Sequence, residues 1–176
     1  MDKGKWWVVS IFLILALVKV HSFGSATDNI WTSSLQGLKE VYVEVEPLDP
    51  AIEKAGLTRK QLQTDVELEL KKAGIKTLLK EQCQSTKGCG LLTVGVATRK
   101  SGSGRYDYYV LALYFQKVSL ERDPEIKTIA ATWMSEGILG TGYDTNAFAS
   151  IRTSVKQQVD EFLVAVLSTY LSVNPK

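Results

Sequence analysis

Hydrophobic and polar residues alternate along the chain over residues 39–46. Val41, Val43 and Val45 fall on one side of this segment and polar residues on the other. A period of two is typical of a half-buried strand. Pro47 ends the pattern, so we expect a strand that stops there.

The next segment, over residues 58–74, has the period of a helix. Thr58 precedes Gln61 by three residues, which is the spacing of a capping box, and apolar residues then repeat every four positions from 62 to 70. Gly74 comes just after this stripe, where a left-handed C-terminal cap is expected. The pattern predicts a helix, followed by a short second strand over Ile75–Leu79.

Two apolar segments surround the turn-rich residues 100–104. Residues 91–98 and 106–118 are therefore interpreted as an antiparallel hairpin. Residues 126–134 are interpreted as a further strand, although their pattern is also compatible with a short helix. These segments place several strands in succession in the middle of the chain.

The clearest element is an amphipathic helix near the end of the sequence, before Pro175. Its apolar residues recur at spacings of three and four: Ile151, Val155, Val159, Phe162, Val166 and Tyr170. Its other face is polar: Arg152, Lys156, Gln157 and Asp160. One stripe of this kind packs against one neighbouring layer.

The order of elements is strand, helix, four strands and helix. Two helices cannot cover both faces of a sheet of about five strands, so we expect them mainly on one face. The predicted fold class is α+β, a two-layer sandwich with a mixed sheet. Residues 38–176 are expected to form a single domain, preceded by a loose lead-in over residues 27–37.

The first residues have the pattern of a secretory signal peptide. Lys3 and Lys5 precede an apolar run over residues 6–18, and the small residues 24–26 offer a cleavage site. The alternative is a retained membrane anchor, but the run is well short of the ~20 residues that span a bilayer. We expect residues 1–26 to be removed. The protein would then be periplasmic or secreted, with no transmembrane span.

Cleavage would remove His21, which is the single histidine of the chain. The exported domain would then have no imidazole to bind a metal or move a proton near neutral pH. The loss of residues 1–26 also leaves basic and acidic residues in equal number. Because nucleic-acid binding requires a basic surface, we expect no nucleic-acid partner.

Several segments resemble a family of exported bacterial proteins of uncharacterised function. They are the strand 41–46, the run 55–58 that leads into a helix ending at 72–75, and the terminal helix that runs into 174–176. The order of elements is also similar to the N-terminal domain of TolB and to modules of CsgG and LpoB. This resemblance implies an envelope-associated binding module, and it assigns no functional residue.

Cys83 and Cys89 enclose five residues between the second predicted strand and the hairpin. In an exported chain, two cysteines this close most simply form one disulfide. The exported domain has no histidine and no second cysteine pair to complete a tetrahedral metal shell. The spacing also differs from the C-x-x-C of redox enzymes.

Gly137, Gly140 and Gly142 precede the terminal helix, and glycines before a helix suggest a phosphate-binding loop. A dinucleotide motif, however, requires a strand after the helix, and a P-loop requires a lysine that is missing here. We therefore interpret residues 135–147 as a flexible loop that leads through Tyr143 into the helix.

Glu44 and Glu46 share one strand face at a separation of ~7 Å, within the range of paired carboxylates in glycosidases. Their side chains would project in parallel, and no sugar-stacking cleft is evident, so we interpret them as solvated. Serine catalysis would require a G-x-S-x-G motif and a histidine base, which the exported domain lacks.

Both faces of the strand over residues 106–118 are apolar or amphipathic. If the helices cover the face with Leu111 and Leu113, then Tyr108 and Tyr114 would form an exposed patch, with Tyr42 beside it. Such a patch marks an interaction site. Alternatively, the strand is central and this face is covered by the 135–147 loop or by the lead-in.

These observations favour an exported, non-enzymatic binding or assembly module whose partner is a protein or another component of the cell envelope. No catalytic residue, metal ligand or cofactor is expected. The alternative is an enzyme that uses carboxylates, or a divalent ion bound by carboxylates. A deep pocket with converging acidic side chains would favour the enzyme, whereas a flat apolar sheet face would favour binding.

Overall fold

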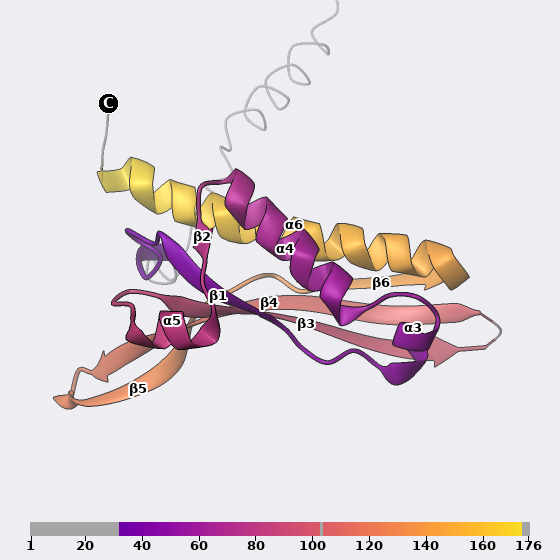
Figure 1. Cartoon of the computed structure of the whole chain (residues 1–176), viewed down its shortest axis with the longest axis horizontal. Coiled ribbons are helices and arrows are strands. Elements are labelled where there is room, and N and C mark those ends of the chain that lie inside the picture. The colour runs from indigo at the N-terminus through magenta and orange to yellow at the C-terminus, as the bar shows by residue number, and fades with distance from the viewer. Residues whose placement is uncertain (1–31, 103, 174–176) are drawn as a thin grey trace, which may run out of the picture.

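The computed structural model describes residues 32–102 and 104–173, which form a mixed sheet with its long helices on one face (Figure 1). Its elements in chain order are β1 (Glu40–Val45), α3 (Pro50–Lys54), α4 (Arg59–Lys72), β2 (Lys76–Thr77), α5 (Lys80–Ser85), β3 (Gly90–Ser101), β4 (Arg105–Leu120), β5 (Asp123–Met134), β6 (Ile138–Tyr143) and α6 (Asp144–Val173). The predicted signal peptide and residues 27–31 lie outside the described residues.

The sheet has the strand order β2-β1-β3-β4-β5, and β6 pairs with β4. β1 runs parallel to both β2 and β3, whereas the pairs that β4 makes with β3, β5 and β6 are antiparallel. The predicted α+β class with a mixed sheet is therefore confirmed. The sheet has six strands rather than about five, because β6 lies within the segment that we expected to be a loop.

β4 is sixteen residues long and changes its neighbour along its length. Its first part pairs with β6 from Arg105 to Val110, and its second part pairs with β5 from Leu113 to Leu120. A register shift between Tyr114 and Phe115 accompanies this second pairing. The far end of the β4–β5 hairpin curves away from the helices, as Figure 1 shows.

The predicted capping box at the start of α4 is confirmed. The Thr58 backbone N–H donates to Gln61 Oε1 at 2.9 Å, and the Gln61 N–H donates to Thr58 Oγ1 at 3.2 Å. After the helix, Gly74 has a φ of 80°, which is the left-handed conformation expected of a C-terminal glycine cap. Leu62, Val66 and Leu70 are buried, as their spacing predicts.

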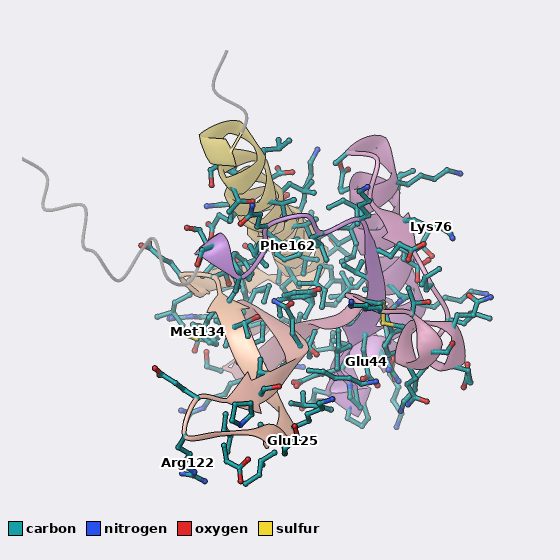
Figure 2. All side chains as sticks on the ribbon, turned by 90° about the vertical axis from the view of Figure 1, so that its left-hand side faces the viewer. Glu44, Lys76, Arg122, Glu125, Met134 and Phe162 are labelled. Carbon is teal, nitrogen blue, oxygen red and sulfur yellow. A yellow bond between two sulfur atoms is a disulfide. The ribbon has the colours of Figure 1, made fainter. Side chains whose placement is uncertain are left out.

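The core lies between the sheet and the helices α4 and α6. One sheet face, which we call the inner face, points toward these helices. It is built from the buried side chains of Val41, Val43, Val45, Leu92, Val94, Val96, Tyr106, Tyr108, Val110, Ala112, Tyr114 and Trp133. Figure 2 shows Phe162 pointing from α6 into this layer, whereas Arg122 and Glu125 lie at the distant tip of the β4–β5 hairpin.

Some local predictions need correction. The strand expected over Ile75–Leu79 is reduced to the two residues of β2, whereas the strand expected over residues 126–134 is confirmed as part of β5. The short helices α3 and α5 were not predicted. In the described part of the lead-in, Leu35 is fully buried, and Ser34 Oγ donates to the backbone oxygen of Thr132 at 2.9 Å, so this part packs on the domain.

Candidate interaction surface

Tyr108 and Tyr114 are buried on the inner face, with exposed fractions of 7% and 0%. The Tyr114 ring lies 5.4 Å from the Phe162 ring of α6, between centroids. The expectation that these tyrosines form an exposed patch is therefore wrong. Both faces of β4 are apolar enough to be covered, and the helices cover the tyrosine face, where Tyr114 packs against Phe162.

Two glycines make room for the buried tyrosine rings. A Cβ atom on Gly140 of β6 would lie 2.3 Å from Cζ of Tyr108, and one on Gly90 would lie 2.5 Å from Cζ of Tyr114. Neither ring could keep its place over an alanine. Gly140 therefore serves the close packing of a strand, and the interpretation of residues 135–147 as a flexible loop is wrong.

The Tyr114 hydroxyl is a buried polar group. Its oxygen lies close to Gly90 but has no hydrogen-bond partner of acceptable geometry among the described residues. Burial raises the pKa of Tyr114 well above its usual range, because the charged phenolate would lose its hydration, and the smaller opposing effect of the nearby Gly90 backbone does not cancel this rise. This side chain has a structural role and is not accessible to a partner.

Neither α4 nor α6 covers the opposite sheet face, which we call the outer face (Figure 1). This face carries large apolar side chains. Strand pairing places Tyr109 beside Leu139, Leu113 beside Met134, and Leu91 between Tyr42 and Phe115. We define the outer face by these residues together with Leu111 and Ile129. Its apolar residues therefore extend over five neighbouring strands.

Several outer-face side chains are strongly exposed. The exposed fraction is 79% for Leu139, 66% for Ile129, 57% for Met134 and 41% for Tyr109. Leu111, Leu113 and Phe115 between them are half-buried. Isolated exposed apolar residues are normal on proteins, but a contiguous group on a sheet face is characteristic of an interaction site.

A pocket of about 180 Å³ lies at one end of the outer face, between the sheet and α5. Leu91, Phe115 and Ile129 provide its apolar part, and Cys83 and Cys89 line the side next to α5. The lining also includes the polar side chains of Glu44, Lys80, Gln84, Gln116 and Lys117. Tyr42 also lines the pocket, so one of the three tyrosines proposed from the sequence does belong to the outer face.

The disulfide between Cys83 and Cys89 is confirmed, with an S–S distance of 1.99 Å and a Cα–Cα distance of 5.3 Å. It ties the buried Cys83 of α5 to the residue that directly precedes β3. Across the pocket, Lys117 Nζ donates to the backbone oxygen of Gln84 at 3.0 Å. The wall of the pocket is thus held by one covalent bond and one hydrogen bond.

The carboxylates Glu44 and Glu46 do not converge on one site. Glu44 forms an ion pair with Arg59 at 3.7 Å, while the Glu46 side chain lies over Gly95, where a Cβ would be 3.0 Å from its Oε2 atom. Within the described residues there is no group of three or more His, Cys, Asp and Glu side chains able to hold a metal ion. None of the described helices is both long and apolar enough to cross a membrane.

The comparisons with known proteins give only distant structural similarities. No protein-family model and no curated protein matches the chain. A variant PelC dodecamer from Paraburkholderia phytofirmans has 15% identity and a TM-score of 0.44, over 70% of this chain and 85% of that one.

Another PelC dodecamer from the same organism has 17% identity and a TM-score of 0.43, over 76% and 86% of the two chains. A minor lipoprotein from Acinetobacter baumannii has 10% identity and a TM-score of 0.38, over 76% and 93%. Similarities at this level carry no argument about function, which must be argued from the surface itself.

Proposed function

We propose that this protein is an exported, non-enzymatic binding module whose outer face docks a distinct partner protein of the cell envelope or extracellular space. The observation that supports this proposal is that helices cover only one of two sheet faces that both carry large apolar side chains. Helices bury the inner face, while Met134 and Leu139 on the outer face remain 57% and 79% exposed.

The chemistry of the outer face favours a protein partner. Its surface around Leu113 and Met134 is apolar, while Glu46 lies over Gly95 beside Leu111. At the pocket end, the charged side chains Glu44 and Lys117 differ in sign. An apolar centre with a mixed polar margin is typical of protein interfaces. An anionic membrane or a nucleic acid would instead be met by a surface of predominantly basic residues.

No observation specifically favours the enzyme. The candidate carboxylates Glu44 and Glu46 contact different groups, and the pocket contains only one acidic side chain among the residues that line it. The paired carboxylates that glycoside hydrolysis would require are not brought together.

The test uses a photo-crosslinking amino acid at Met134 or Leu139 in cells that produce the protein naturally. The same amino acid at Val164 or Leu167 is the matched control, because these α6 residues are similarly exposed, at 65% and 56%. We expect one and the same protein to be crosslinked from both outer-face positions and not from α6. Aspartate at the neighbouring outer-face position should abolish the crosslink, since an exposed substitution alters stability by only ~0.5 kcal/mol.

Three outcomes would contradict the proposal. Crosslinks of similar yield from the outer face and from α6 would mean that the outer face has no special role. Crosslinks to a second copy of the chain would replace the partner with self-association, and crosslinks to lipid alone would make the surface a membrane contact.

A further inference from the structure

The pocket at the end of the outer face has properties that a flat protein contact does not require. Its volume is about 180 Å³. An apolar cavity of ~150 Å³ is large enough to hold benzene, so this pocket has room for one aromatic ring or a short alkyl chain. Phe115 and Leu91 from the sheet and the Cys83–Cys89 bridge give it an apolar surface on two sides.

Two lysine side chains, Lys80 and Lys117, line this largely apolar pocket. Lys80 begins α5 and forms no ion pair or side-chain hydrogen bond among the described residues. Lys117 donates to the Gln84 backbone oxygen at 3.0 Å, and an ammonium group has two further donors. The lining carboxylate of Glu44 already faces Arg59 at 3.7 Å. The charge available to a ligand is therefore positive.

We propose that this pocket binds a small amphiphilic anion, with a carboxylate between Lys80 and Lys117 and its apolar group against Leu91 and Phe115. An apolar pocket with a few converging polar groups is the usual form of a small-molecule site. Pairing with a carboxylate would give Lys80 the partner that it lacks among the described residues, and the disulfide keeps the wall in place before the ligand arrives.

The same chemistry is offered by an alkyl carboxylate and by the carboxyl terminus of a peptide that ends in an aromatic residue. The two sources differ in the shape of the apolar group and in the presence of a peptide bond. Octanoate represents the first, and N-acetylphenylalanine represents the second. Octanol, octylammonium and N-acetylphenylalanine amide are the matched compounds that lack the negative charge.

The test is a titration of the intact, oxidised protein followed by NMR and calorimetry. We expect one of the two carboxylates to bind more tightly than its uncharged and cationic counterparts and to shift the signals of Leu91 and Phe115. Lys80→Ala and Lys117→Ala should each weaken binding by about twofold to fivefold, as for the loss of one exposed ion pair. Glu44→Gln should strengthen it.

Lys71→Ala is the control, because Lys71 is an exposed lysine of α4 away from the pocket. Equal binding of octanoate and octanol, unchanged affinity in both lysine variants, or shifts confined to other parts of the protein would each overturn the proposal. So would the failure of both carboxylates to bind. None of these results depends on the partner protein, so they are distinguishable from a failure of the proposed docking surface.

Discussion

The substitution Tyr114→Phe removes a single buried oxygen from the centre of the protein. Tyr114 is fully buried, its ring packs against Phe162 of α6, and its hydroxyl has no hydrogen-bond partner of acceptable geometry among the described residues. In the unfolded chain the same hydroxyl bonds to water. Folding therefore gives up a hydrogen bond at this position and regains none.

The magnitude follows from the cost of that lost bond. A buried polar group left without a partner destabilises a protein by ~1–3 kcal/mol, and phenylalanine keeps the ring and its contacts. We subtract a small loss of packing where the oxygen lay over Gly90 and expect Tyr114→Phe to stabilise the fold by ~1 kcal/mol. Tyr114→Ala, in contrast, should destabilise it by ~3–5 kcal/mol, as for other truncated core aromatics.

The effect should also depend on pH. Because burial raises the pKa of Tyr114 in the folded state, the folded protein holds the phenol proton at pH values where the unfolded chain has lost it. The wild-type protein thus keeps its full stability below pH ~10 and loses stability as the pH rises further. The advantage of Tyr114→Phe should then grow by up to ~1.4 kcal/mol for each pH unit above that point.

Urea unfolding at pH 7 and at pH 10.5 measures both effects. Tyr109→Phe is the control, since Tyr109 is 41% exposed on the outer face and its substitution should change stability by less than ~0.5 kcal/mol. A Tyr114→Phe variant less stable than the wild type would mean that the hydroxyl is hydrogen-bonded. An advantage that stays constant with pH would mean that Tyr114 is not buried as described.

Three further predictions are independent of Tyr114. Gly140→Ala should cost ~1–3 kcal/mol in urea unfolding because a tyrosine ring occupies the space, whereas Gly95→Ala meets only the flexible end of a glutamate and should cost less than ~1 kcal/mol. Intact-mass analysis of the exported protein should show no alkylation of Cys83 and Cys89 without reductant and two additions after reduction, and two free thiols beforehand would contradict the bridge. N-terminal sequencing should show cleavage near Ala26, and an exported protein that begins at Met1 would disprove the signal peptide.

Sequence patterns correctly predicted the elements whose side chains clearly favour one local structure or have only one apolar face. The spacing of Thr58 and Gln61 located the start of α4, and Ile151 and Phe162 belong to a stripe that is apolar on one side only. In such elements the local pattern and the tertiary packing agree, so the sequence alone is enough. The disulfide was predictable for a similar reason, because two cysteines in a short segment have few other uses.

The sequence could not decide which face of β4 the helices cover. Leu111 and Leu113 on one side and Tyr108 and Tyr114 on the other are all suited to burial, and a period of two gives no preference between two apolar faces. The deciding contacts are distant in the chain, between the tyrosines and Gly90 or Gly140. The alternation of Leu111, Leu113 and Phe115 is visible in the sequence. It is the signal from which the apolar outer face could have been predicted.

The change of partner along β4 has a consequence for the motions of the protein. From Arg105 to Phe115, β4 pairs with β3 on one side, whereas its remaining residues have no β3 partner. The other side of β4 is shared between β6, which packs on α6, and β5, whose residues 123–129 are exposed. Segments with few buried contacts open at low free energy, without global unfolding. Amide hydrogen exchange should thus be slow from Tyr106 to Tyr114 and fast toward Leu120. The same strand would then contain the most protected part of the domain and a segment that is able to rearrange when a ligand or partner binds the outer face.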